Sequence, residues 1–183
     1  MNDADKERAI ALLNTIMELE LAGVVRYTHY SLMVFGLNRI PIVGWLKANS
    51  DESLLHARKA GELVAWLGGH PSLAIGALLD THRHDVTDIL RESLEHEKSA
   101  LARYYELLQA VQGKSVLLEE YARQMVVAEE LHLDEVNKML RHPGAVEVGA
   151  LLVDLRLGPH DDAGDAEAAL QAAARGEGVG VAL

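Results

Sequence analysis

Apolar residues recur at steps of three and four over four long stretches of the chain. In the first stretch, about residues 5–35, these steps place one apolar stripe along a helix, and its members are Ile10, Leu13, Met17, Val24, Tyr27 and Val34. The same spacing over about 41–67, 86–112 and 116–142 predicts three more helices. Glycines separate the stretches, and Ser115 is placed to cap the last one. The sequence therefore predicts an all-α fold, a four-helix bundle within residues 1–142.

The connection between the second and third stretches, residues 68–85, is long enough to cross such a bundle. About 18 extended residues span roughly 55–60 Å, whereas a helix like the second is about 40 Å long. We therefore expect a long crossover, with the second and third helices running parallel.

The end of the chain has a different composition. Seven of the chain's 15 glycines lie in residues 143–183, a frequency that disfavours one continuous helix. Within this stretch, the alanine-rich segment 165–175 can form a short helix. We expect a C-terminal tail that follows the bundle domain.

An acidic residue interrupts the apolar stripe of each predicted helix, near its middle. Two of the four are followed by a histidine about one turn later, so the set is Glu20, Glu52 with His56, Glu97, and Glu129 with His132. A carboxylate that faces a bundle core is costly unless a cation or a hydrogen bond compensates its charge. Four glutamates and two histidines on facing helices are the ligand set of a carboxylate-bridged dinuclear metal site. Iron accepts carboxylate oxygen and imidazole nitrogen together, so we predict two Fe ions per subunit, with Mn as the alternative metal.

The spacing in the second helix departs from that in the fourth. Glu129 lies three residues before His132, but Glu52 lies four before His56, and Ser53 occupies the position three before. On a regular helix Glu52 would still lie about 40° from His56, on the same face. A one-residue π-bulge between them is a second possibility. The third is that this helix has lost its bridging ligand, so that the site is mononuclear or inactive.

Two tyrosines follow predicted ligands by seven residues, Tyr27 after Glu20 and Tyr104 after Glu97. A tyrosine at this position can hydrogen-bond a ligand carboxylate or donate an electron to an oxidised metal. It can also be an ordinary amphipathic core residue. We interpret Tyr104 as a core residue and keep Tyr27 as a candidate functional residue.

Composition narrows the choice of partners and of compartment. The chain has 28 acidic and 17 basic residues, a formal net charge of -11, and no cysteine. This charge argues against nucleic-acid binding through phosphates and suits attraction of cations. Without cysteine, disulfides and thiolate metal ligands are excluded. The N-terminus lacks the features of a signal peptide, and no apolar run reaches the roughly 18 residues of a membrane span, so we expect a cytoplasmic protein with no membrane partner.

Several of these motifs resemble those of bacterioferritins. The segment Glu20-Leu-Ala-Gly-Val-Val-Arg-Tyr27 is similar to their first-helix motif, and the segments ending at Glu97 and His132 are similar to their third and fourth. The resemblance covers about residues 5–142. It implies a ferritin-like bundle whose di-iron centre oxidises Fe(II) with oxygen or peroxide. It also implies a homo-oligomer, which in many members of the family is a hollow shell that stores ferric mineral.

One feature of that family is not matched. Bacterioferritins bind haem through a methionine that immediately follows the second-helix glutamate. In this chain Ser53 follows Glu52, and Leu54 occupies the position if His56 anchors the alignment. Because neither residue is methionine, the resemblance does not support a haem site.

The leading functional prediction is a di-iron ferroxidase, with iron storage if a shell forms. One alternative is a dinuclear manganese or iron enzyme that scavenges peroxide. Another is a structural helical assembly protein with a vestigial metal site, and Ser53 is the residue that favours it. A large hollow oligomer would favour storage, and a small one would favour the alternatives.

Overall fold

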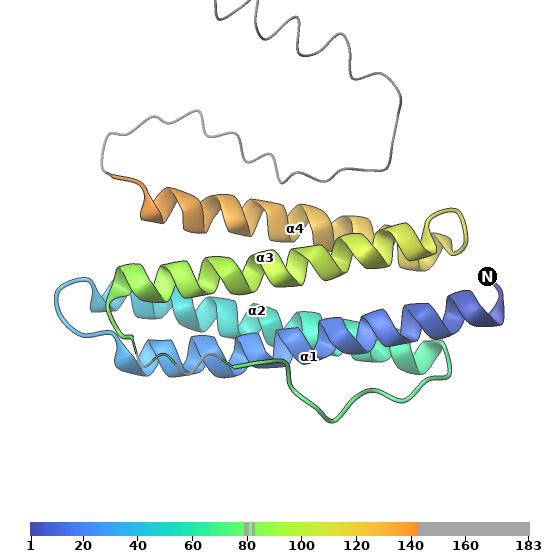
Figure 1. Cartoon of the computed structure of the whole chain (residues 1–183). Coiled ribbons are helices and arrows are strands. Elements are labelled where there is room, and N and C mark those ends of the chain that lie inside the picture. Colours follow the sequence, from blue (N-terminus) through green and yellow to red (C-terminus); the bar gives the residue numbers. More distant parts are fainter. Residues whose placement is uncertain (79–80, 82, 143–183) are drawn as a thin grey trace, which may run out of the picture. The chain divides into compact units, whose positions relative to one another are not determined.

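A computed structural model describes residues 1–78, 81 and 83–142 of the chain. Four helices make up this part (Figure 1), and they are α1 (Asp3–Met33), α2 (Arg39–Trp66), α3 (Val86–Val111) and α4 (Val116–Leu140). The predicted all-α four-helix bundle is therefore confirmed. The predictions made for residues 143–183, including a short helix over 165–175, lie outside the described residues.

Local chemistry explains where the helices begin and end. The side chains of Asn2, Asp85 and Ser115 accept hydrogen bonds from backbone N–H groups in the first turns of α1, α3 and α4. Gly68 and Gly113 adopt positive φ values of 76° and 69°, which a glycine reaches without steric strain, just after α2 and α3. The short turns between α1 and α2 and between α3 and α4 make each of these pairs antiparallel.

The crossover between α2 and α3 runs back along α1. Asn14 of α1 donates a hydrogen bond to the His70 carbonyl at 3.1 Å and accepts one from the Ser72 N–H at 2.8 Å. Further along, the Gly76 N–H donates to the Glu18 carbonyl at 2.7 Å. Because the crossover returns the chain to the end where α2 begins, α2 and α3 run parallel, as predicted (Figure 1).

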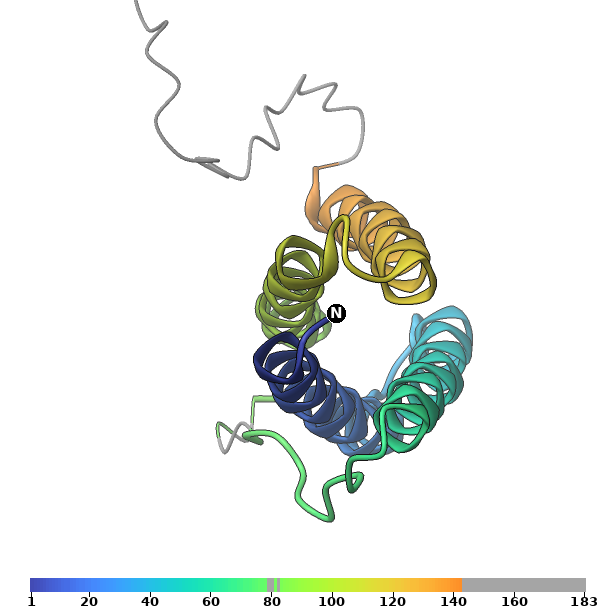
Figure 2. The ribbon, with the colours of Figure 1, turned by 90° about the vertical axis from the view of Figure 1, so that its right-hand side faces the viewer.

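The four helices surround a common core, seen end-on in Figure 2. Helix α1 packs against both α2 and α3, and α3 packs against α4. The core consists mainly of leucine, alanine and valine side chains, many of them from the predicted stripes. Buried polar residues interrupt it, and those most relevant to function are Glu20, Arg26, Ser53, His56, His96, Glu97 and Glu129.

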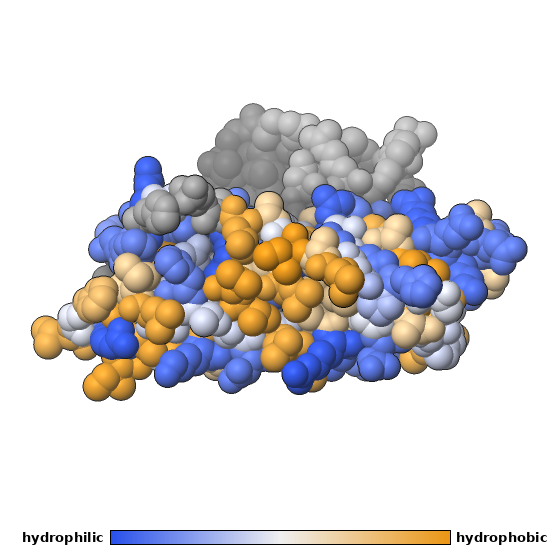
Figure 3. Space-filling model, turned by 90° about the horizontal axis from the view of Figure 1, so that it is seen from below, coloured by the Kyte–Doolittle hydropathy of each residue, from blue (hydrophilic) through white to orange (hydrophobic). Residues whose placement is uncertain are grey.

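Exposed apolar side chains occur on α1, on the turn after it, at the start of α2 and on the crossover, and these include Val25, Leu32, Phe35, Leu37, Ile40, Leu73, Ile75 and Leu78. Others lie further along α2 and on α4, namely Leu55, Trp66, Val116, Leu117, Val127 and Leu131. Figure 3 views the bundle from the side where α1 and the crossover run, and apolar groups gather near the middle of this face and at one edge. No helix in the described part of the chain is long and apolar enough to cross a membrane.

Candidate metal centre

Carboxylate and imidazole groups converge midway along the bundle in two clusters. One contains Glu20, His56 and Glu129, and the other contains Glu97, Glu129 and His132. Within each cluster, the potential ligand atoms all lie within 4.8 Å of one another. Glu129 belongs to both clusters, so its carboxylate is placed between two positions where a cation would have three ligands from the chain.

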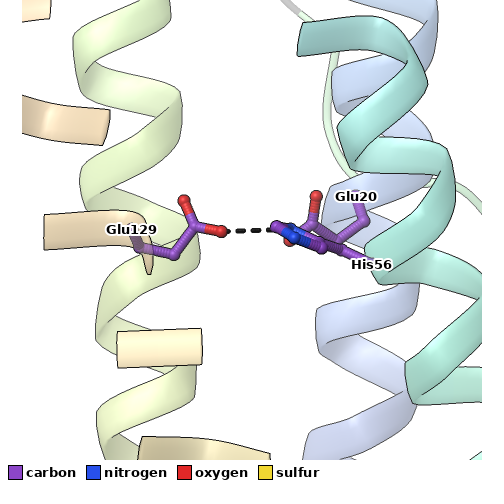
Figure 4. Close-up of side chains that lie close together, drawn as sticks. All are labelled: Glu20, His56 and Glu129. Carbon is purple, nitrogen blue, oxygen red and sulfur yellow. Dashed lines mark ion pairs between the residues drawn. The ribbon is translucent and has the colours of Figure 1, made fainter. Parts of the chain in front are cut away.

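The first cluster joins three helices. His56 Nδ1 of α2 lies 3.2 Å from Glu129 Oε1 of α4 and 3.5 Å from Glu20 Oε1 of α1. Figure 4 shows the Glu129 carboxylate pointing across the bundle toward the His56 ring, with the Glu20 carboxylate beside that ring. All three side chains are buried. They are therefore withdrawn from water and can share one cation.

The second cluster joins α3 and α4. His132 Nδ1 lies 3.8 Å from Glu97 Oε2. His132 Nε2 is buried and has no hydrogen-bond partner among the described residues. An unpartnered imidazole nitrogen beside two buried carboxylates suits a metal ligand, because a bound cation would satisfy it.

The buried carboxylates change the proton affinity of the first cluster. Burial raises the pKa of Glu129, and the carboxylates of Glu97 and Glu20 act in the same direction. The hydrogen bond with His56 opposes them, and the resulting pKa is about 8. Burial lowers the pKa of His56, but its hydrogen bonds with Glu129 and Glu20 outweigh this effect and raise the pKa to about 10. The metal-free cluster thus retains protons at neutral pH, in positions where a divalent cation would supply the positive charge.

Two tyrosines hold the outer carboxylates. The Tyr27 hydroxyl of α1 donates a hydrogen bond to Glu97 of α3. The Tyr104 hydroxyl of α3 donates one to Glu20 of α1 at 2.7 Å. Burial raises the pKa of both tyrosines well above its usual value, so both remain protonated donors. Tyr104 lies in the apolar core, as predicted, and its hydroxyl also holds a carboxylate of the candidate centre.

Glu52 is not brought into either cluster. Its side chain is 53% exposed, and its Oε1 lies 3.8 Å from His56 Nε2. Helix α2 is regular through these residues, so the π-bulge considered above is absent. Ser53 is the residue that faces the interior, with its Oγ against the backbone of Gly23 in α1. Around the helix axis, Glu52 and Ser53 lie about 100° apart with His56 between them, and the contact between α1 and α2 buries the serine side.

Comparison with protein families places this chain in one of them. A model of the ferritin-like domain matches residues 10–143. The chain belongs to the ferritin-like family. No sequence among the curated proteins matches the chain.

Solved structures share the ferritin-like fold. A ferritin-like, diiron-carboxylate protein from Bacillus anthracis matches with a TM-score of 0.72 and 21% identity, over 77% of this chain and 100% of the other. A dodecameric thioferritin from Bacteroides fragilis, described as bacterioferritin-related, matches with a TM-score of 0.69 and 22% identity, over 74% and 85%. The bacterioferritin of Desulfovibrio desulfuricans matches with a TM-score of 0.66 and 21% identity, over 76% and 82%. At these identities the comparison establishes the fold.

The ferritin-like bundle contains two further polar residues that sequence reasoning missed. Arg26 is buried, its Nη1 lies 3.0 Å from His96 Nδ1, and its Nη2 donates to the Glu92 carbonyl at 3.1 Å. His96 is also buried. Arg26 and His96 immediately precede Tyr27 and Glu97, at the flank of an apolar stripe. Charged and polar residues at such positions usually face solvent, so only the packing of α1 against α3 reveals that both lie inside.

Proposed function

We propose that this ferritin-like protein is a ferroxidase, which oxidises Fe(II) with oxygen or peroxide at a dinuclear site. The observation that supports this proposal most directly is the presence of two ligand clusters that share Glu129. Glu20 and His56 would hold one metal, and Glu97 and His132 the other. Carboxylate oxygen and imidazole nitrogen suit iron, and they accept manganese as well.

In this proposal the protein contributes charge, position and seclusion from water. A bound iron pair would supply the redox chemistry. The carboxylates of Glu20, Glu97 and Glu129 would neutralise most of the charge of two divalent cations. Tyr27 and Tyr104 keep two of these carboxylates oriented through the hydrogen bonds that they donate. The net charge of -11 favours the approach of Fe(II).

We also propose that the protein acts as a homo-oligomer. The exposed apolar side chains of α1 and the crossover support this proposal, because such surface is usually covered by a partner. If the oligomer is a hollow shell, oxidised iron could be stored inside it. If it is small, the product would be released.

An anaerobic titration of the metal-free protein with Fe(II), followed by exposure to air, tests the ferroxidase proposal. We expect saturation at about two irons per chain and then rapid growth of the near-ultraviolet absorbance of ferric iron. The Glu62→Gln variant is the matched control and should behave like the original protein, since this α2 carboxylate is exposed and belongs to neither cluster.

Two results would contradict the ferroxidase proposal. Binding of one iron or none, with oxidation no faster than in buffer, would leave a mononuclear or vestigial site. Rapid consumption of hydrogen peroxide by the manganese-loaded protein, without oxidation of Fe(II), would instead favour the peroxide-scavenging alternative.

A further inference from the structure

Helices α2 and α4 supply unequal ligands to the proposed centre. In α4, Glu129 lies three residues before His132, and its carboxylate belongs to both clusters. The corresponding position in α2, three before His56, is Ser53, which is only 7% exposed. A serine hydroxyl neither reaches as far as a glutamate carboxylate nor carries its charge. The α2 side of the centre therefore lacks an anionic ligand.

The missing anionic ligand leaves the charge of the proposed centre unbalanced. The clusters contain the carboxylates of Glu20, Glu97 and Glu129, whose combined charge is smaller in magnitude than that of two divalent cations. A net positive centre in a low-dielectric interior is costly unless a further anion joins it. The nearby Arg26 adds to the positive charge, since its partners His96 Nδ1 and the Glu92 carbonyl are uncharged. Its Nε is buried and has no hydrogen-bond partner among the described residues.

Two hydrogen-bonding groups lie close together beside Gly23 of α1. A Cβ atom built on Gly23 would lie 2.8 Å from Ser53 Oγ and 3.0 Å from His96 Nε2. The serine hydroxyl and the histidine ring therefore meet at one point on the backbone of α1. They come from α2 and α3, the helices on either side of α1.

The contact with Arg26 fixes which nitrogen of His96 carries the proton. A guanidinium group can only donate hydrogen bonds, so His96 Nδ1 accepts from Arg26 and Nε2 carries the proton. This arrangement is the reverse of that of a metal ligand, whose second nitrogen donates to an acceptor. In the described part of the chain, His96 belongs to neither ligand cluster. His96 Nε2 is therefore a hydrogen-bond donor on the Ser53 side, polarised by the charge of Arg26.

We propose that a small carboxylate-type oxyanion from solution, such as formate, acetate or bicarbonate, occupies the place of the missing α2 carboxylate. The proposal rests on the dinuclear site proposed above. The oxyanion accepts hydrogen bonds from Ser53 Oγ and His96 Nε2, and it would supply the planar carboxylate group and the negative charge that the α2 side of the centre lacks. The Arg26 charge, acting through His96, favours an anion at this point.

Binding of Co(II) to the metal-free full chain tests this inference without relying on activity. The titration is run in a chloride buffer free of oxyanions and repeated with millimolar acetate, bicarbonate or phosphate, while the visible absorbance of Co(II) is followed. We expect acetate and bicarbonate to tighten binding of the second Co(II) by about 10–100-fold and to change the spectrum. Phosphate, which is tetrahedral, should have a smaller effect.

Variants identify the residues responsible. Ser53→Glu supplies a carboxylate from the chain, so two Co(II) ions should bind without added oxyanion, and the oxyanion effect should disappear. His96→Phe keeps a ring of similar size but removes the donor, and should reduce the oxyanion effect at least about tenfold. Glu62→Gln, a change on the exposed side of α2 and outside both clusters, should leave the effect intact.

The outcomes separate this inference from the function on which it rests. Two Co(II) ions bound with equal affinity and spectrum, whether or not an oxyanion is present, would overturn the proposed oxyanion and leave the dinuclear site standing. An effect of phosphate alone would also overturn it, because the planar carboxylate geometry would then be wrong. Binding of fewer than two ions under every condition, in Ser53→Glu as well, would overturn both proposals.

Discussion

Glu129 is the single residue on which the geometry of the candidate centre depends. Glu20 and His56 belong to one ligand cluster, and Glu97 and His132 belong to the other. Glu129 alone belongs to both clusters. Burial raises the pKa of its carboxylate to about 8. A change at this position therefore affects both proposed metal positions, whereas a change at Glu20 or Glu97 affects one directly.

The Glu129→Gln substitution keeps the size of this side chain and removes its charge. We expect metal affinity and the rate of Fe(II) oxidation to fall by at least about 100-fold. The metal-free variant should remain folded, because burial raises the pKa of Glu129 to about 8, so the amide replaces a group that is largely uncharged at neutral pH in the absence of metal. Metal titration and thermal unfolding together check this prediction. Unchanged affinity in Glu129→Gln would mean that the shared carboxylate is not a ligand.

The adjacent rings of Tyr104 and Tyr121 allow a matched test of the hydrogen bond to Glu20. Their centroids are 6.3 Å apart, yet the Tyr104 hydroxyl donates to Glu20, whereas the buried Tyr121 hydroxyl has no partner among the described residues. Tyr104→Phe leaves a buried carboxylate without its donor, so we expect a loss of about 1–3 kcal/mol in unfolding free energy and about tenfold weaker metal binding. Tyr121→Phe should change neither the unfolding free energy nor the metal affinity appreciably. Equal effects of the two substitutions in denaturant unfolding and metal titration would show that the hydrogen bond contributes nothing specific.

At the scale of the elements, the close approach of α1 and α2 decides what α2 presents to the centre. Gly23 of α1 lies directly against Ser53 of α2, so the two helices meet there without a side chain of α1 between them. This approach buries the Ser53 side of α2 and leaves Glu52 outside. The orientation of α2 about its own axis is therefore set by a contact between helices.

Two glycine-to-alanine substitutions test this contact. A Cβ at position 23 would lie 2.8 Å from Ser53 Oγ and 3.0 Å from His96 Nε2, whereas one at position 44 of α2 would meet nothing within 4 Å. Alanine favours a helix by up to about 1 kcal/mol over glycine, so Gly44→Ala should stabilise the protein by about that amount. In Gly23→Ala, overpacking of about 1–3 kcal/mol outweighs this gain, and we expect net destabilisation. Urea unfolding measures both, and equal stabilisation by the two substitutions would contradict the close contact.

The turn between α3 and α4 is held by two carboxylates that titrate in acid. The hydrogen bond from Lys114 is the main cause that lowers the pKa of Asp5, and the Gly113 N–H is the main cause that lowers the pKa of Glu119. Because each pKa is lower in the folded than in the unfolded state, the stabilisation is present above the unfolded pKa and is lost as the pH falls through the folded pKa. Thermal unfolding of the Asp5→Asn/Glu119→Gln variant should show a lower Tm than the original protein at about pH 6. The difference should shrink by about pH 3, and a constant difference would show that these ionised groups are not responsible.

At the scale of the whole molecule, the charge and the apolar surface suggest separate roles. The net charge of -11 opposes non-specific association and favours cation approach. Apolar side chains are exposed on α1 and the crossover (Figure 3), and others on α2 and α4, and such surface favours association with a partner. These properties are compatible with an ordered oligomer that binds metal.

Leu73 and Ile75 of the crossover allow the homo-oligomer proposal to be tested. Both are exposed, and neither belongs to the apolar core. We expect Leu73→Asp/Ile75→Asp to lower the oligomeric state measured by light scattering, because burying two carboxylates in an apolar interface is unfavourable. The helical content measured by circular dichroism should not change. An unchanged oligomer would place the interface elsewhere on the surface.

The sequence by itself determined the helices and the set of polar residues that interrupts them. The 3.6-residue period is a local property, so the apolar stripes predicted α1 to α4 and placed Glu20, Glu97 and Glu129 at their interior faces. The length of the segment between α2 and α3 predicted the crossover for a similar reason, since the reach of an extended chain depends on its number of residues.

Only the tertiary structure decided which of Glu52 and Ser53 faces the interior of the bundle. It also showed that the Tyr104 hydroxyl donates to Glu20 and that Arg26 contacts His96 inside the bundle. In each case the answer depends on how far a helix is rotated about its axis and on what its neighbour presents there. Adjacent residues on a helix differ by about 100°, so a small rotation exchanges an interior position for an exposed one. That rotation is fixed by contacts such as that of Gly23 with Ser53, between residues far apart in the sequence.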